Sequence, residues 1–355
     1  MDSSRNQAKQ RVLLVAADNF TPRTRTPWGG TRLATMKGIT TDSPLVVGES
    51  WEISVEPSFP SALDGGGALL FEVIAADPDH WLGADASLGN TSLLVKLLDT
   101  DDALSVQIHP SDDYPSLAAD ESGKPESWYI VAAEAGAGIY LGLEDGVTSS
   151  DIQECLGSEG NLAAMLTFVE VTEGDFFVID AGTAHAIGPG LTLVEPQRVL
   201  PGRRGLTYRY WDWNRRYDDE GKQNELGQPR ALDVADAIAT TRFDHPRGHD
   251  LVQRIRRRAG SPDLAQPAQF IALSDPEALG AIRFAPLSVG RIAGDGKLTL
   301  PPRNYLRSIT VVAGNISVEG QTVSPGRSAV LAADGHPYEL DCTNAHAVVS
   351  AAHTG

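Results

Sequence analysis

The sequence predicts a mostly β protein with two hydrophobic cores, each built as an antiparallel barrel or sandwich. Short apolar runs of strand length recur along the chain, and Gly, Pro, Asp and Ser separate them. The chain holds 35 glycines and 22 prolines, enough to supply the turns of such a fold. At 355 residues it is too long for one ordinary core, and its 41% of hydrophobic residues can fill two.

The N-terminal two thirds combine predicted strands with a few helices. Helical spacing occurs at 68–76, 149–156 and 231–240, and Thr148, Ser149 or Ser150 would cap the second of these helices. We therefore expect one domain over 1–240 with helical segments near 60–80 and 145–165. The predicted strands of this part are 45–47, 51–55, 93–98, 176–179 and 191–194.

The pattern changes from about residue 241, where alternating strands predominate. We expect a second, smaller barrel over 241–355 without a metal. The lone candidate ligand there is His336, which has no Gln, Glu or second His at strand spacing nearby. The remaining histidines are predicted to lie on the surface: His80, His245, His249, His346 and His353. The predicted strands are 305–312, 315–318, 328–331 and 347–349.

Charge and cysteine usage limit the partners and the compartment. The formal net charge of −18 disfavours nucleic acid and anionic membranes as partners. Two distant cysteines, Cys155 and Cys342, cannot make a disulfide framework, which favours a reducing compartment. The apolar stretch 12–17 is too short for a signal sequence or a membrane span. We expect a soluble, cytoplasmic protein, with a monomer as the default state.

One strand carries two candidate metal ligands. Side chains of a strand repeat on one face every second residue, so Gln107 and His109 point the same way. Glu126 opens a second strand and His185 follows the turn at 182–184. These four side chains would make a nitrogen and oxygen ligand set that suits zinc and also admits manganese, iron or cobalt.

The same residues carry a resemblance to a known family. The segment from Gly174 to His185 resembles the second cupin motif, with Asp180 where proline is usual. The segment 107–109 resembles the first cupin motif, with Gln107 in place of its first histidine. In order and spacing, the whole set resembles the short bacterial form of type I mannose-6-phosphate isomerase. The further matching segments are 28–30, 48–51, 94–99, 126–130 and 207–209.

The resemblance implies two cupin-like jelly-roll barrels and a zinc-dependent aldose-ketose isomerase of mannose 6-phosphate and fructose 6-phosphate. It implies that one zinc ion per chain is held by Gln107, His109, Glu126 and His185. It also implies a set of residues for catalysis and substrate binding. The catalytic candidates are Arg209, Glu195 and Lys124, and the substrate-binding candidates are Lys96, Ser105 and Trp28. The chain departs from the family pattern at 196–198 and 199–205, next to Glu195.

The chemistry of such an isomerase makes demands of its own. A proton next to the carbonyl must move to the neighbouring carbon through a cis-enediol, so a base must reach both carbons and cations must offset the developing charge. Glu195 is the first choice for the base, with Lys124 or a metal-bound water as alternatives, and Lys96 and Arg209 could offset the charge. Donors for the phosphate are Arg23, Arg25, Arg32, Lys96, Arg203, Arg204 and Arg209, with the hydroxyls of Ser105 and Ser111.

Two other functions are compatible with the same sequence. The metal barrel could isomerise a different phosphorylated or free sugar. Alternatively, the altered segment after Glu195 could have removed the acid-base machinery and left a non-catalytic, sugar-binding regulatory cupin. A panel of aldoses and ketoses separates the first from the main hypothesis. Binding without proton exchange at C1 or C2 would identify the second.

Overall fold

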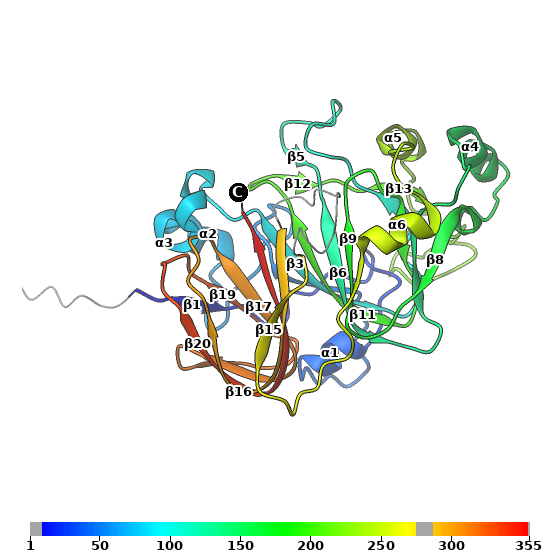
Figure 1. Ribbon diagram of the computed structural model, residues 1–355. Helices are drawn as coiled ribbons and strands as arrows, with labels where there is room; N and C mark the ends of the chain where they lie inside the picture. The colour runs from blue at the N-terminus through cyan, green and yellow to red at the C-terminus, as the bar shows by residue number, and fades with distance from the viewer. Residues whose placement is uncertain (1–8, 275–286, 354–355) are drawn as a thin grey trace, which may run out of the picture.

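The computed structural model describes residues 9–274 and 287–353, and it is mostly β as predicted (Figure 1). Its strands form three large sheets and one small parallel pair, β5 (Glu121–Ser122) with β12 (Arg204–Gly205). Within the described ranges, no sheet closes on itself. No helix of this part of the chain has the length and apolar character needed to cross a membrane.

A six-stranded antiparallel sheet forms one layer of the N-terminal part. Its central strands are buried along nearly their whole length, which explains their continuous apolar runs. The register pairs Glu195 with Lys96 and Gln197 with Glu126. In spatial order the strands are β14 (Arg256–Arg258), β9 (Asp175–Ile179), β6 (Glu126–Ala133), β11 (Leu191–Arg198), β3 (Leu93–Thr100) and β2 (Glu49–Ile53).

A five-stranded antiparallel sheet forms the second layer. Its register places Gln107 beside both His185 and Arg209. Ile139, Leu141 and Ile187 of this sheet belong to the same hydrophobic cluster as the six-stranded sheet, so the two sheets share a core. In spatial order the strands are β13 (Tyr208–Trp211), β4 (Val106–Ile108), β10 (His185–Ile187), β7 (Gly138–Leu143) and β8 (Leu166–Glu170).

The C-terminal part forms a seven-stranded sheet around its own core (Figure 1, orange to red). Two strands cross the expected boundary near residue 240: the first strand of the chain pairs with β19, and β14 pairs with β9. The sheet consists of β1 (Val12–Leu14), β19 (Ser328–Leu331), β17 (Arg307–Val318), β20 (Tyr338–Ala352), β16 (Leu287–Leu300) and β15 (Gln269–Ala272), with β18 (Gln321–Val323) beside β17.

Two buried polar contacts join the N-terminal and C-terminal strands. The Tyr129 hydroxyl lies 2.8 Å from His346 Nε2. Glu52 forms a fully buried ion pair with Lys37 and accepts a hydrogen bond of 3.0 Å from Ser328 Oγ. The prediction that His346 lies on the surface is therefore wrong, because its ring is 2% exposed and packs against Tyr129.

Three of the helices were expected from the sequence: α2 (Leu70–Ala76), α4 (Ser149–Gly157) and α5 (Val234–Thr240). Of the three candidate caps of α4, Thr148 is the one whose hydroxyl accepts from the Asp151 amide, at 3.3 Å. Helices α4 and α5 lie at the edge of the molecule away from the C-terminal sheet (Figure 1). The other helical elements are short: α1 (Arg32–Met36), α3 (Pro78–Leu82), α6 (Gly248–Ile255) and 3-10 helices at Gly83–Leu88 and Leu162–Met165.

Candidate active site

Three buried side chains from both sheets meet in one cluster. The nitrogens of His109 and His185 and the carboxylate of Glu126 lie within 4.8 Å of one another. His109 Nε2 is 3.2 Å from one oxygen of Glu126, and His185 Nε2 is 3.4 Å from the other. The three residues are almost completely buried. Glu126 comes from the six-stranded sheet, whereas His185 begins a strand of the five-stranded sheet and His109 directly follows another.

The imidazole rings of His109 and His185 each make a backbone hydrogen bond through Nδ1, which leaves Nε2 of both rings available. His109 Nδ1 lies 2.9 Å from the Leu206 carbonyl, and His185 Nδ1 lies 2.9 Å from the Thr183 carbonyl. A carbonyl only accepts, so both rings carry their proton on Nδ1 and direct an unprotonated Nε2 at Glu126. His109 Nε2 and Glu126 Oε1 have no hydrogen-bond partner although they are buried.

This arrangement fits a divalent metal. Buried polar atoms without a partner are rare in folded proteins and call for one. Burial and the charge of Lys124 lower the pKa of His109 to about 3, so its ring is neutral at physiological pH, as a metal ligand must be. Burial also lowers the pKa of His185. Burial acts to raise the pKa of Glu126, but the interaction with His109 outweighs it and keeps the group ionised.

Two glutamines flank the cluster. The amide of Gln107 lies 3.4 Å from His185 Nε2, within reach of a fourth ligand position. Gln197 Nε2 donates to Glu126 Oε2 at 2.6 Å and so restrains the orientation of the carboxylate. Supporting contacts of this kind orient the ligands of metal sites. The four predicted ligands are thus together in space.

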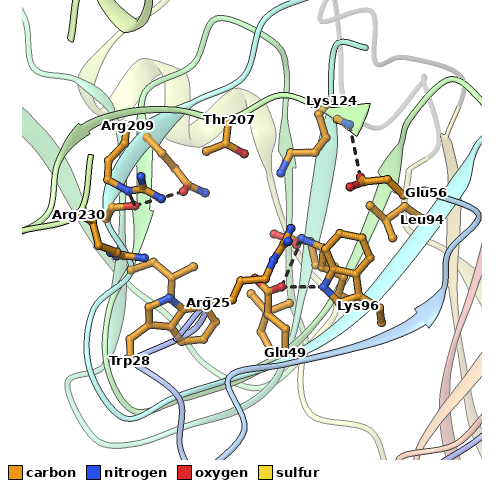
Figure 2. A pocket seen from close by; sticks show the side chains of 17 residues that line it. Arg25, Trp28, Glu49, Glu56, Leu94, Lys96, Lys124, Thr207, Arg209 and Arg230 are labelled. Carbon is orange, nitrogen blue, oxygen red and sulfur yellow. Dashed lines mark hydrogen bonds and ion pairs between the residues drawn. The ribbon is translucent and has the colours of Figure 1, made fainter. Parts of the chain in front are cut away.

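A cavity of about 220 Å³ opens beside this cluster, and Gln107 forms part of its wall (Figure 2). Figure 2 shows Arg209, Arg230 and Trp28 on one side of the opening, and Lys124 and Glu56 on the other. The volume lies slightly below the roughly 300–1,000 Å³ of sites for drug-sized ligands, which suits a small molecule. The wall is rich in charged side chains: Arg25, Arg209, Arg230, Lys96, Lys124, Glu49, Glu56 and Glu195.

Lys96 and Glu195 form the central ion pair of this wall. Lys96 Nζ is 3.6 Å from Glu195 and 3.8 Å from Glu49, and it lies 4.6 Å from the centre of the Trp51 ring. Burial alone would lower the pKa of Lys96, but the two carboxylates raise it, so the amine stays charged. Burial and the charge of Glu126 raise the pKa of Glu195 to about 8. Trp128 Nε1 donates to Glu195 Oε1 at 2.9 Å and fixes its orientation.

Lys124 is a further buried cation of this wall. Its side chain is 7% exposed, and within the described ranges no hydrogen bond or ion pair engages its Nζ. Burial, followed by the charge of Lys96, lowers the pKa of Lys124. A lysine whose pKa is lowered gives up its proton more readily than an exposed one, which makes Lys124 a candidate acid-base group.

Arg209 is held at the cavity wall by a predicted site residue. Its Nε donates to Ser105 Oγ at 3.0 Å, and its Nη1 donates to the Ala231 carbonyl at 2.9 Å. Ser105 therefore supports Arg209 while it also lines the cavity. Trp28 is 4% exposed and lines the same wall. Arg230, which the sequence did not single out, pairs with Asp212 at 2.6 Å.

The structure divides the predicted phosphate donors into two groups. Arg25, Lys96, Arg209 and Ser105 line the cavity. The others are engaged elsewhere: Arg32 pairs with Asp99 at 2.6 Å, Arg204 pairs with Glu121 at 2.7 Å, and Ser111 pairs with Asp113. Arg203 donates to the Glu121 carbonyl, and neither Arg203 nor Arg23 lines the cavity.

Sequence reasoning missed four residues of the site. Glu49, Glu56, Arg230 and Gln197 all contact the cavity wall or the cluster. A signal existed for Glu49, because a lysine inside the apolar run 93–98 needs a buried acid as a partner. Arg230 lies in irregular structure with no pattern to identify it.

Over 58% of its length the chain is similar in sequence to mannose-6-phosphate isomerases. It is 35% identical over 210 residues to that of Streptococcus mutans and 34% identical over 209 residues to ManA of Bacillus subtilis. Each match covers 58% of this chain and 63% or 64% of the relative, so it spans less than two thirds of either relative's length. No protein-family model matches the chain.

Solved structures extend the likeness to the whole fold. The crystal structure of mannose 6-phosphate isomerase from Bacillus subtilis matches with a TM-score of 0.74 at 23% identity, over 96% of this chain and 99% of that one. A putative mannosephosphate isomerase from Archaeoglobus fulgidus matches with a TM-score of 0.74 at 20% identity, over 98% and 100%. A zinc-bound mannose 6-phosphate isomerase matches with a TM-score of 0.65 at 14% identity, over 97% and 100%. The chain therefore has the fold of these structures, and its sequence similarity to mannose-6-phosphate isomerases agrees with the resemblance noted from its motifs.

Proposed function

We propose that this chain, a relative of the mannose-6-phosphate isomerases with their fold, interconverts mannose 6-phosphate and fructose 6-phosphate in a zinc-dependent reaction. One observation carries the proposal. A buried His109–Glu126–His185 cluster adjoins a cavity whose wall presents an acid-base pair and several cations. The sugar phosphate needs all three features: a metal for its oxygens, a base for its proton and cations for its phosphate.

The metal would be held by His109, Glu126, His185 and Gln107. Two unprotonated imidazole nitrogens, one carboxylate and one amide oxygen match the ligands that zinc accepts. When bound, zinc would act as a Lewis acid toward the oxygens of the open-chain sugar. Gln197 would hold the carboxylate of Glu126 in place through its 2.6 Å hydrogen bond.

Glu195 would move the proton. Its carboxylate would take the proton from C2 of the open aldose while O1 gains a proton, and would return the proton to C1 of the cis-enediol while O2 loses one, which gives the ketose. A pKa of about 8 is close to the working pH, where a general base is most effective. Trp128 would keep one oxygen of Glu195 in position, and Lys96 would keep the group partly ionised. Lys124 is the alternative acid-base group.

The cations would bind and neutralise the anionic substrate. Arg209 and Lys96 would offset the negative charge that develops on the enediol oxygens. Arg25 and Arg230 reach the same cavity and suit a phosphate, which prefers several donors. Trp28 would provide a flat wall for the sugar, and Ser105 would hold Arg209. In a chain with a net charge of −18, these local cations are what permits a dianion to enter.

The organisation of the chain is proposed in the same terms. The sheets of the N-terminal 240 residues would form a catalytic, cupin-like jelly roll, and residues 241–355 would form a second one without metal. The two sheets that share the site residues support the first part. Strands β1 and β14 would tie the two units together, because each pairs with a sheet of the other unit.

A coupled assay for fructose 6-phosphate tests the proposal. The protein is stripped with a chelator, assayed with mannose 6-phosphate, and assayed again after zinc is restored. We expect activity to vanish and to return. If the protein binds one zinc per chain but is inactive both before and after zinc is restored, mannose 6-phosphate is not its substrate. That result would favour another sugar as substrate, or a sugar-binding regulatory cupin. A panel of free and phosphorylated aldoses then separates these two alternatives.

A further inference from the structure

A second cavity of about 220 Å³ lies in the C-terminal sheet, apart from the candidate active site. Strands β15, β16, β17 and β20 contribute to its wall, and it shares no described residue with the first cavity. Most of the wall is apolar, and no acidic residue is among its described members. The apolar members include Phe270, Val289, Leu300, Tyr305 and Val349.

Arg307 is the unusual residue of this wall. It is 6% exposed, yet within the described ranges it forms no ion pair with a carboxylate. Its Nη1 donates to the Pro301 carbonyl at 2.9 Å, but its Nε and Nη2 have no partner. The nearby Asp334 is already engaged by Arg11. This buried guanidinium lies 5.6 Å from the centre of the Tyr338 ring and has one carbonyl acceptor, so two of its nitrogens have lost water without a hydrogen-bond partner in return.

Other groups of the same wall also suit an anion. Ser350 Oγ is buried without a partner, and the exposed Arg303 adds a second cation. Burial lowers the pKa of Arg307 and the charge of Arg303 adds to this effect, while Tyr338, Tyr305 and Asp334 act in the opposite direction. A positive, apolar cavity in a chain with a net charge of −18 is selective for a ligand with both properties.

We propose that this C-terminal cavity binds a small organic anion, a carboxylate or phosphate ester with an apolar body, whose charged end contacts Arg307 and Arg303. The apolar wall would cover the body of the ligand, since burial of apolar surface drives binding to such pockets. The site is independent of the isomerase chemistry, and its ligand is an effector or a second metabolite, distinct from the sugar phosphate.

Methyl NMR of the full chain tests the proposal at the cavity itself. The methyl signals of Val289, Leu300 and Val349 are followed during titration with phenyl phosphate, benzoate and the uncharged benzyl alcohol. We expect saturable shifts with at least one anion and binding of benzyl alcohol at least tenfold weaker. The two anions distinguish a phosphate site from a carboxylate site. No saturable shift with either anion, or equal binding of benzyl alcohol, overturns the proposal.

A matched pair of variants assigns the binding to Arg307. Arg307→Met should weaken the preferred anion at least tenfold. Arg291→Met is the control, because Arg291 is also buried, has an unpartnered Nε, and does not line the cavity. It should change the affinity less than twofold. Unchanged affinity in Arg307→Met overturns the proposal. If that variant fails to fold, the comparison of the anions with benzyl alcohol on the unmodified protein decides.

Discussion

The hydrogen bond from Gln197 to Glu126 gives a sharp test of the metal site. Gln197 is fully buried and donates at 2.6 Å to Glu126 Oε2, the carboxylate oxygen that also lies 3.2 Å from His109 Nε2. Gln197→Met preserves the length of the side chain and removes this donor. Glu126 would then keep its charge but lose the contact that orients it, so zinc affinity should fall.

The magnitude follows from the kind of bond that is lost. A hydrogen bond to a charged group contributes about 1.5–3 kcal/mol, and loss of a supporting contact lowers metal affinity by roughly 10–100-fold, or about 1.4–2.7 kcal/mol. The two ranges overlap, so we expect zinc Kd to rise by at least tenfold. Competition with a chromophoric zinc chelator measures the value directly, without any use of the enzymatic activity.

Gln321→Met is the matched control for this experiment. Gln321 also donates a hydrogen bond, to the Val12 carbonyl at 3.1 Å, but it lies in the C-terminal sheet. Its replacement should leave zinc Kd unchanged within twofold. If Gln197→Met folds normally and its zinc Kd also stays within twofold of the unmodified protein, the assignment of Gln197 as a support of the metal ligand is refuted.

Three further perturbations have defined outcomes. Lys96→Met removes a cation that lowers the pKa of Glu195, so the acidic limb of the pH profile of kcat/KM should move to higher pH. An unchanged acidic limb would contradict the electrostatic pairing of Lys96 with Glu195. His346 is buried, and its pKa is lowered from 6.5 to about 4 in the folded protein. The unfolded chain therefore binds a proton at this residue at a higher pH than the folded protein does. About 3 kcal/mol of the free energy of unfolding should be lost as the pH falls from 6.5 to 4. Urea unfolding at both pH values should show a smaller loss in His346→Gln; an equal loss refutes this role. Glu52→Gln should lower the free energy of unfolding in urea by about 3–5 kcal/mol, because it leaves Lys37 charged, buried and unpaired. The double variant Lys37→Met, Glu52→Leu should restore much of this loss. A loss below about 1 kcal/mol in Glu52→Gln would refute the importance of this ion pair.

The relative placement of Gln107 and His109, two of the proposed metal ligands, could be predicted because it depends on a local pattern. The alternation of a strand places Gln107 and His109 on one face, and the structure brings both beside His185 and Glu126. The apolar run that Lys96 interrupts also indicated a buried charge, which is present. Helix α4 was predictable for a similar reason, because Thr148 and Asp151 satisfy its first amides.

The parts that could not be predicted depend on contacts distant in sequence. His346 is buried in the middle of the C-terminal sheet and packs against Tyr129, 217 positions away. The pairing of β1 with β19 joins the two ends of the chain, and no periodicity within Val12–Leu14 indicates its partner. Arg230 reaches the cavity from irregular structure through its pairing with Asp212. The surroundings of His346, β1 and Arg230 therefore depend on tertiary contacts and not on the local sequence pattern.

We propose that Glu195 moves a proton between C1 and C2 of a sugar phosphate at the His109–Glu126–His185 site. The most direct test is the reaction of mannose 6-phosphate in D₂O with the zinc-loaded protein and with Glu195→Gln, followed by NMR at C1 and C2. The account predicts conversion to fructose 6-phosphate by the unmodified protein. It predicts that Glu195→Gln still binds one zinc per chain but loses both conversion and deuterium exchange by roughly 10²–10⁴-fold. Full turnover by Glu195→Gln would contradict it.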